Sequence, residues 1–384
     1  MNILIAPDKF KNSLSAQEIT RLFQACFQAL DPTIRCTLFP LADGGDGTTE
    51  IFLHHKGGKK ITVTVDDPLF RPRAAWYVLS HDEKTAFMEM ANASGLQLLK
   101  PEERRVMETT TLGTGQMIAD ALDRGVEKIV MGIGGSGTND GGIGALTALG
   151  FVFLDDIGRP LNPIGSSLTK IKKIDITNIH PGLKELSLTA ICDVDNPLVG
   201  MHGAAFVYGP QKGGTPEELI ILNQGLENFA ARVQETSNKE IAHLPGAGAG
   251  GGIAGGIVGL MDGVLKKGID AIFEMTAFEE KVRMTDWIIT GEGRIDNQTL
   301  YGKVVSGVSV MAKKHNKKII VVAGKNELSM QVLKNMGLEV VFCLTDIADE
   351  SVAMEEGEKI LKELIHSQIY PFLKRQIEKK DWSR

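Results

Sequence analysis

Short apolar runs alternate with amphipathic segments along much of the chain. The run NILIAP at 2–7 is typical of a buried strand, and ITRLFQACFQAL at 19–30 has the apolar spacing of a helix that covers a core. Ser15 and Glu18 stand at the spacing of a capping box, which predicts that this helix begins directly after Ser15. Strands that alternate with helices predict an α/β fold with mainly parallel strands.

The last third of the chain repeats this pattern. The runs 286–294, 317–324 and 338–344 predict strands, and 304–315 predicts a helix between the first two. A charged amphipathic helix is expected over 355–377. The two ends of the chain therefore have the same kind of organisation.

The middle of the chain differs from both ends. Residues 61–91 hold three runs rich in β-forming residues, separated by turns rather than by helices, which predicts a mixed sheet. We therefore predict two α/β domains: a discontinuous, doubly wound parallel-sheet domain of residues 1–60 plus 270–384, and an inserted mixed-sheet domain of residues 61–269.

Composition and charge exclude several classes of protein. The 384 residues suit two domains, and 43% hydrophobic with 23% charged residues is ordinary for a globular chain. A net charge of −6 is not the basic footprint of a nucleic-acid-binding protein. No apolar run is long enough to span a membrane, and the N-terminus becomes charged too soon for a signal peptide. We expect a cytoplasmic protein without nucleic-acid or membrane partners, and a homodimer is compatible with the sequence.

The stretch GIGGSGTNDGG at 132–142 follows a predicted strand and precedes a predicted helix. Its glycines match the spacing of a dinucleotide-binding loop, and Asp155 or Asp156 stands about 20 residues further on, where an acid would bind a ribose. An NAD-dependent dehydrogenase of a small hydroxy acid is therefore one hypothesis. The aspartate in TNDGG would repel a bare pyrophosphate, whereas Mg²⁺ between them would make the contact favourable. This second feature favours a metal–phosphate substrate.

Charged residues also collect after other predicted strands, and ligands of doubly wound folds bind at the carboxyl ends of strands. No Walker-type phosphate loop, G-x-S-x-G elbow or H-E-x-x-H motif occurs, so common NTPase and hydrolase mechanisms are disfavoured. The charged and polar residues that follow these predicted strands are Asp8, Lys9 and Lys11; Asp43 and Asp46; Asp193, Asp195 and Asn196; and Glu292, Arg294, Asp296 and Lys303.

Taken together, the motifs resemble those of the bacterial glycerate kinase family over nearly the whole chain. In order they are APDKFKNSLSA, LADGGDGT, DDPLFRP, EMANASGL, TTTLGTGQ, GIGGSGTNDGG, CDVDNPL, GAGAGGG and GEGRIDNQTLYGK. The resemblance implies ATP-dependent phosphorylation of D-glycerate, giving 2-phosphoglycerate rather than 3-phosphoglycerate. It also implies two α/β domains, one of them Rossmann-like, with the active site in the cleft between them. Asn12 and Gly137 depart from the residues common in the family, and neither removes a charged group.

Carried onto this chain, the family motifs and the chemistry of phosphoryl transfer predict four groups of site residues. The catalytic group is Asp193, as the base for the glycerate hydroxyl, with Lys9, Lys11 and Arg294. The group that binds substrate is Arg71, Ser136, Asn139 and Asn196, with Arg71 and Arg294 gripping the glycerate carboxylate. The group that binds ATP is Gly134, Gly135, Asp140, Glu292 and Lys303. The group expected near Mg²⁺ is Asp43, Asp46 and Asp296.

Overall fold

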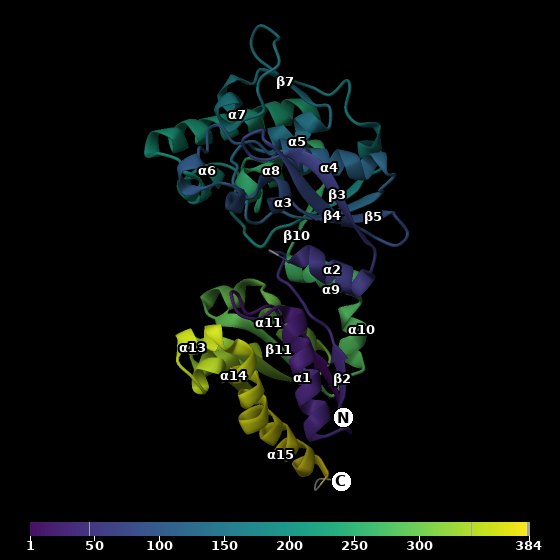
Figure 1. Ribbon diagram of the computed structural model, residues 1–384. Coiled ribbons are helices and arrows are strands. Elements are labelled where there is room, and N and C mark those ends of the chain that lie inside the picture. Colours follow the sequence, from purple (N-terminus) through teal and green to yellow (C-terminus); the bar gives the residue numbers. More distant parts are fainter. Residues whose placement is uncertain (46, 339, 382–384) are drawn as a thin grey trace. The chain divides into compact units, whose positions relative to one another are not determined.

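The computed structural model describes residues 1–45, 47–338 and 340–381. It divides into two compact units, of which unit 1 contains residues 1–43 and 268–384 and unit 2 contains residues 44–267 (Figure 1). The first division thus lies after Asp43, whereas we expected it near residue 60. Helix α2 (Thr48–Lys56) packs within unit 2, because its Phe52 stacks on Phe87 with ring centroids 4.4 Å apart.

Unit 1 is built on a five-stranded sheet in which every neighbouring pair is parallel. Across the sheet, the strand order is β13-β12-β11-β1-β2. Counted along unit 1 alone, this is the order 2-1-3-4-5 of a doubly wound sheet, whose topological switch point lies between β1 and β11. The predicted parallel sheet is confirmed. Its strands are β1 (Asn2–Ile5), β2 (Arg35–Leu38), β11 (Trp287–Ile295), β12 (Lys318–Asn326) and β13 (Val340–Cys343).

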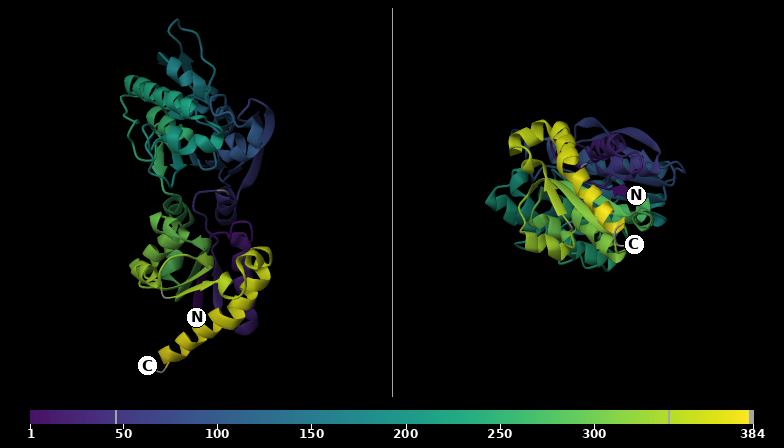
Figure 2. Two further views of the ribbon diagram at one scale, coloured as in Figure 1. Left: turned by 90° about the vertical axis from the view of Figure 1, so that its left-hand side faces the viewer. Right: turned by 90° about the horizontal axis from the view of Figure 1, so that it is seen from below.

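Helices cover the sheet of unit 1. Helices α1 and α14 lie side by side on one face, where Ile3 and Ile5 pack with Phe23, Phe27 and Leu361 (Figures 1 and 2). The expected capping box of α1 is confirmed, since Ser15 N–H donates to Glu18 Oε2 at 2.8 Å. The helices are α1 (Ala16–Leu30), α9 (Gly268–Thr276), α10 (Phe278–Arg283), α11 (Val304–Lys314), α12 (Met330–Met336), α13 (Glu350–Glu355), α14 (Gly357–Leu364) and α15 (Tyr370–Asp381).

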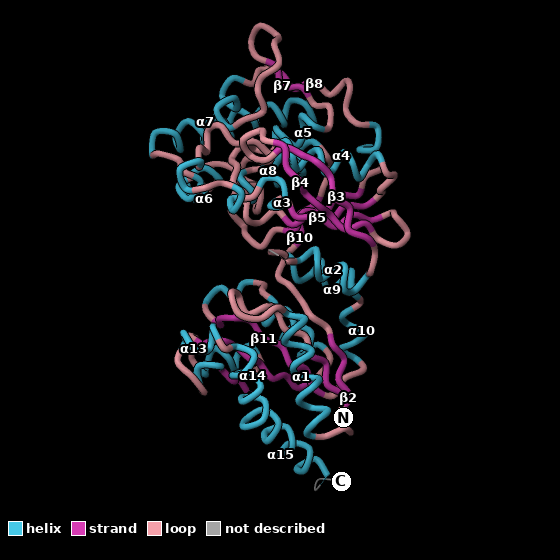
Figure 3. The backbone as a smooth tube through the Cα atoms, in the orientation of Figure 1, coloured by secondary structure: helices cyan, strands magenta, loops and turns pink. Residues whose placement is uncertain are grey.

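Unit 2 contains the predicted mixed sheet, whose strands are drawn in magenta in Figure 3. The strand order is β10-β9-β6-β5-β4-β3. The first four strands of this order are parallel, and β4 and β3 are antiparallel to their neighbours. A separate two-stranded sheet pairs β7 (Val152–Leu154) with β8 (Lys173–Asp175). The six main strands are β3 (Lys59–Asp66), β4 (Pro72–Leu79), β5 (Thr85–Glu89), β6 (Lys128–Gly132), β9 (Ser187–Ile191) and β10 (Val264–Lys266).

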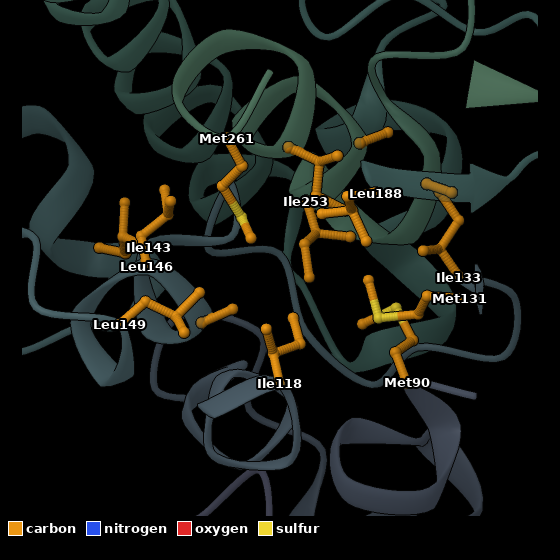
Figure 4. Close-up of a cluster of buried hydrophobic side chains, with 14 of the residues drawn as sticks. Met90, Ile118, Met131, Ile133, Ile143, Leu146, Leu149, Leu188, Ile253 and Met261 are labelled. Atoms are coloured by element: carbon orange, nitrogen blue, oxygen red, sulfur yellow. The ribbon is translucent and has the colours of Figure 1, made fainter. Parts of the chain in front are cut away.

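The core of unit 2 joins the sheet to the surrounding helices through aliphatic and methionine side chains. Figure 4 shows Met131 and Leu188 of the sheet in one cluster with Ile118, Ile143 and Ile253 of three helices. Burying each such side chain stabilises the fold by about 1.5–3 kcal/mol. In the part of the chain that the structure describes, no helix is both long and apolar enough to cross a membrane. The remaining helices are α3 (Ala91–Ser94), α4 (Leu112–Asp123), α5 (Ile143–Ala148), α6 (Ala204–Tyr208), α7 (Pro216–Ser237) and α8 (Ile253–Leu260).

Candidate active site

A cavity of about 380 Å³ lies in unit 1 at the carboxyl edge of the parallel sheet. The loops that follow β1, β2, β11 and β13 contribute to its wall, together with the last residues of β11 and β12 and with α13. It therefore includes the loops on both sides of the switch point between β1 and β11, where doubly wound folds bind their ligands. The charged residues of its wall are Asp8, Lys9, Lys11, Asp43, Glu292, Arg294, Asp296, Lys303, Lys325 and Glu350.

The cavity brings together predicted residues that are far apart in the sequence. They are Lys9, Lys11, Asp43, Glu292, Arg294, Asp296 and Lys303. Asp46, which we predicted beside Asp43, lies outside the described residues. Asp8, which we noted at the end of the first predicted strand without giving it a role, also lines the cavity, as do Lys325 and Glu350, which we did not predict.

Two carboxyl groups of the cavity are buried. Asp8 is 7% exposed, and burial together with the nearby charge of Asp43 raises its pKa to about 8. Burial also raises the pKa of Glu292 to about 7, although a hydrogen bond from the Thr299 hydroxyl and the charge of Lys303 oppose this shift. Ionised carboxylates disfavour one another in such a poorly solvated place. A cation among them would relieve this repulsion.

The donor set of the cavity suits Mg²⁺ bound together with a phosphate. Mg²⁺ takes oxygen ligands and is commonly held by one or two carboxylates plus substrate phosphates. Asp43 and Asp296 supply carboxylates of this kind, next to Asp8 and Glu292. Among the described residues, no group of three or more His, Cys, Asp or Glu side chains is arranged to hold a metal ion.

Cationic side chains also line the cavity. Arg294 Nη2 lies 3.1 Å from one carboxylate oxygen of Glu350, and Lys325 Nζ lies 3.0 Å from the other. These side chains are 40–52% exposed, so water screens the pairs and a bound anion can compete for the cations. Lys303 is the residue before the first turn of α11, where helix N–H groups also favour an anion.

The glycine loop of unit 2, Gly132–Gly142, leaves β6 and enters α5 as predicted. Gly134 and Gly135 are exposed, and Gly135 has a φ of 70° that favours glycine. The loop pairs antiparallel with the segment 94–96: Leu96 N–H donates to Gly135 O, and Gly137 N–H donates to Ser94 O, both at 2.8 Å. The exposed tip is thus held by main-chain hydrogen bonds.

The carboxylate of Asp140 is buried inside this loop and has no solvent exposure. It accepts hydrogen bonds from Thr111 N and Oγ1, both at 2.8 Å, from Gly142 N at 3.1 Å and from Gly144 N at 3.2 Å. Burial raises the pKa of Asp140, and these hydrogen bonds oppose that shift. Since protein donors occupy its oxygens, we revise the role proposed from the sequence: Asp140 holds the loop rather than contacting a nucleotide.

Ser136 and Asn139 are buried as well, at 7% and 0% exposure. Asn139 Nδ2 donates to Ala204 O at 3.2 Å. Ser136 Oγ lies 2.7 Å from Nζ of Lys212, which also donates to Thr138 O at 2.6 Å. The sequence offered no signal for Lys212, because a lysine in the stretch GPQKGG is expected to be solvated.

Lys212 is only 2% exposed, and burial lowers its pKa to about 7. The negative charge of Asp140 opposes this shift. A lysine is almost never fully buried without partners, and here its partners belong to the glycine loop.

Asp193 lies two residues beyond the end of β9, and its side chain is exposed. Because β6 and β9 are parallel neighbours, Asp193 and the glycine loop leave the same edge of the sheet. Both ends of the Asn196 side-chain amide form hydrogen bonds within the protein: Nδ2 donates to His202 O at 2.8 Å and Oδ1 accepts from Tyr208 Oη at 2.7 Å. Its carbonyl oxygen also accepts from Gly248 N–H at 3.0 Å, which ties the glycine-rich segment 246–252 to this loop.

Arg71 occupies the turn before β4 and forms two ion pairs within unit 2. Its Nε lies 2.7 Å from Asp67 Oδ2, and its Nη1 lies 2.6 Å from Glu103 Oε1. The side chain is 46% exposed, so it remains accessible to solvent. A substrate carboxylate would have to compete with both acids for this arginine.

The position of Asp155 does not suit a dinucleotide-binding fold. In that fold the ribose-binding acid follows a strand beside the strand of the glycine loop. Asp155 instead follows β7, which belongs to the separate two-stranded sheet, while the neighbours of β6 are β5 and β9. Its carboxylate accepts from Ile157 N at 3.0 Å and Arg159 N at 2.8 Å, and so closes a local turn.

Comparisons with known proteins agree with one another. The model of the glycerate kinase family matches residues 3–372. A glycerate kinase of Halalkalibacterium halodurans is 41% identical over 362 residues, covering 94% of this chain and 95% of the relative. The glycerate 2-kinase of Escherichia coli is 39% identical over 342 residues, covering 89% and 90%. A crystal structure from Salmonella typhimurium LT2, provisionally assigned as glycerate kinase 2, has a TM-score of 0.88 and 37% identity, covering 98% of this chain and 99% of that one.

Proposed function

We propose a reaction from the premise that this chain belongs to the glycerate kinase family and is a kinase. The reaction is transfer of the terminal phosphoryl group of ATP to the 2-hydroxyl group of D-glycerate, which gives 2-phosphoglycerate and ADP. Transfer to the 3-hydroxyl group, giving 3-phosphoglycerate, is the alternative. Because ATP is the phosphoryl donor, we expect the reaction to take place in the cytoplasm.

The observation that carries this proposal is the cavity at the switch point of unit 1. Catalysis of phosphoryl transfer consists largely of positioning and of stabilising charge on the transferring group. Lys9, Lys11 and Lys303 supply positive charge to phosphate oxygens, and Arg294 offers a planar pair of donors to a carboxylate or a phosphate. The cavity thus supports binding of an anionic substrate.

The carboxylates of the cavity suit Mg²⁺, and Asp43 and Asp296 are the protein groups that would hold it. When bound, it would neutralise charge on the phosphate oxygens. The protein contributes the rest: the lysines orient the phosphates, and the buried wall around Asp8 and Glu292 limits the access of water.

Asp193 is the proposed base for the glycerate hydroxyl group. Its carboxylate would accept the hydroxyl proton as the oxygen bonds to phosphorus and the bond between that phosphorus and the leaving oxygen of ADP breaks. Its place just past a parallel strand gives it a defined position, and its exposure leaves it accessible to a substrate. Arg71, with a side chain that is 46% exposed, is the second proposed partner of the glycerate carboxylate beside Arg294. For Ser136, Asn139 and Asn196, hydrogen bonds within the protein support roles in shaping the binding loops.

An ADP-release assay with and without D-glycerate tests the reaction, and ³¹P NMR of the product separates the 2-phosphate from the 3-phosphate. Asp193→Asn should lower kcat by roughly 10²–10⁴-fold, the usual contribution of a positioned base. Asp195→Asn is the matched control, because Asp195 is exposed in the same loop. Equal turnover in the two variants would exclude Asp193 as the base. NADH-dependent reduction of a hydroxy-acid precursor would favour the dehydrogenase hypothesis, which the position of Asp155 does not support.

A further inference from the structure

We propose that Lys212 is a positioning residue, whose ammonium group fixes Ser136 and Thr138 and so holds the glycine loop in the shape that binds the phosphates of the nucleotide. This inference rests on the proposed function, because it assigns the exposed tip of the loop to a phosphate ligand. It adds a residue that no sequence motif indicated. The exposed tip consists of Gly134 and Gly135.

The backbone around Lys212 places its side chain beneath the loop. The residue ends a short 3₁₀ turn, Pro210–Lys212, and Gly213 follows with a φ of 88°. A Cβ atom at Gly213 would lie 2.1 Å from Arg104 O, so only glycine fits between Lys212 and its neighbouring segment. The direction in which Lys212 enters the core is therefore defined by its own turn.

The lysine and the main chain hold two sides of the same short segment. On one side, Leu96 and Ser94 form the antiparallel main-chain bonds already described. On the other side, Lys212 Nζ contacts Ser136 Oγ at 2.7 Å and Thr138 O at 2.6 Å. An ammonium group has three donors, so Lys212 can donate to the Ser136 hydroxyl and to the Thr138 carbonyl at the same time. An apolar side chain would leave both acceptors without this partner. The segment between these two restraints is the part of the loop next to the exposed glycines.

The loop carries polar atoms that the protein does not satisfy. Thr138 Oγ1 and Asn139 Oδ1 are buried, and neither has a hydrogen-bond partner among the described residues. Buried polar atoms without partners are uncommon and costly, so this conformation is not the one that the loop residues would prefer by themselves. Lys212 and Asp140 are the charged groups that hold it, with Tyr208 as the aromatic neighbour of the ammonium at 6.0 Å from its ring centroid.

A purely structural role would not require a charge at this place. Well-packed apolar side chains often replace buried ionic groups without loss of stability. A buried ammonium group, in contrast, adds positive charge beneath the exposed loop tip, where a phosphate would be attracted to it. This physical difference separates the proposal from simple packing.

The test compares Lys212→Met and Lys212→Arg with Lys239→Met. Lys239 is a control in unit 2, because its Nζ also donates to a main-chain carbonyl, Val258 O at 2.8 Å, and pairs with Asp262 rather than with the glycine loop. Lys212→Met should raise the KM for Mg·ATP at least tenfold, while the KM for D-glycerate changes less than threefold. Lys212→Arg should recover part of this loss, and Lys239→Met should leave both constants unchanged.

Amide hydrogen exchange provides a readout that needs no substrate. In Lys212→Met, amides of the peptide 132–142 should exchange at least tenfold faster than in the wild type, and those of β9 should be unchanged. Ser136→Ala is a milder variant that removes one partner of Lys212 and serves if Lys212→Met does not fold. It should accelerate exchange in the same peptide.

Three results would overturn the proposal: unchanged loop exchange in both Lys212→Met and Ser136→Ala, equal increases in both KM values, or the same kinetic loss in Lys239→Met. A wild-type protein that does not phosphorylate D-glycerate would refute the proposed function alone. Loop exchange would still decide whether Lys212 holds the glycine loop.

Discussion

Replacement of Asp140 by alanine is the most direct test of how the glycine loop is built. The change removes one buried carboxylate that accepts four hydrogen bonds, from Thr111 N and Oγ1, Gly142 N and Gly144 N. Asp140 has 0% exposure, so water cannot replace these acceptors without opening the loop. The donors therefore remain unsatisfied in the folded variant.

The magnitude follows from the number of donors and from the charge. Each buried donor without a partner costs about 1–3 kcal/mol, and the costs of neighbouring donors do not add fully. Burial of the Asp140 charge is itself unfavourable, as its raised pKa indicates, so part of the loss is offset when the carboxylate is removed. We expect Asp140→Ala to lower the free energy of unfolding of unit 2 by about 3–5 kcal/mol, typical of breaking a buried charged network.

Asp175→Ala is the matched control. Asp175 also accepts from the main-chain N–H and the hydroxyl group of a threonine two residues on, Thr177, at 2.9 and 2.6 Å. That site is exposed to water, which can take over both hydrogen bonds. The control therefore removes the same kind of hydrogen bonds from an exposed site. Asp175→Ala should lower the free energy of unfolding clearly less than Asp140→Ala.

Urea unfolding at pH 7 measures both variants, with Trp76 as the reporter of unit 2 after Trp287 and Trp382 are changed to phenylalanine. With a slope of about 1–3 kcal/mol per molar urea, Asp140→Ala should lower the midpoint by roughly 1 M or more. If its midpoint fell no further than that of Asp175→Ala, the buried carboxylate would not stabilise the loop, and our revised role for Asp140 would be wrong.

Three further variants test other parts of the structure. Ser15→Ala removes the cap of α1 and should destabilise unit 1 by about 1 kcal/mol in urea unfolding followed by Trp287 fluorescence, so an unchanged midpoint would contradict the role of the cap. A hydrogen bond from Lys314 and further cationic neighbours lower the pKa of Glu279 from its ordinary 4.5 to about 2. The ionised Glu279 therefore stabilises the folded protein above pH 4.5, and this stabilisation is lost as the pH falls toward 2. The stability difference between wild type and Glu279→Gln should therefore shrink from pH 6 to pH 3, and a constant difference would refute this coupling. In Gly113→Ala the new Cβ would lie 1.8 Å from Asp66 O, so its thermal midpoint should fall well below that of the wild type, and an equal midpoint would disprove the close approach.

Local features of the fold could be predicted because they depend on neighbouring residues. The capping box of Ser15 and Glu18 at the start of α1 is confirmed. The parallel sheet of unit 1 and the mixed sheet of unit 2 are confirmed as well. They could be predicted because helices connect parallel strands, whereas turns connect antiparallel strands. The charged residues after β1, β2 and β11 could be expected at one edge, because the carboxyl ends of parallel strands lie together.

The middle of the chain was harder to divide. Residues 44–60 read as a continuation of the first domain, but Phe52 stacks on Phe87 and Thr49 N–H donates to Glu89 at 2.9 Å, which attaches α2 to unit 2. The glycine spacing of 132–142 likewise matched two kinds of binding loop. Only the pairing of β7 with β8 removed Asp155 from the place that a dinucleotide would require.

The order of residues along the chain was thus sufficient for the family, the fold class and the residues that gather at the edge of the unit 1 sheet. It was not sufficient for Lys212 and Asp140, a lysine and an aspartate that the tertiary structure buries at 2% and 0% exposure. Burial of a charged side chain depends on partners distant in the sequence, here the 74 to 76 residues between Lys212 and its contacts in the glycine loop. Hydrophobic periodicity indicates which apolar positions are buried. It cannot indicate a charged side chain that is buried because a folded loop supplies its hydrogen bonds.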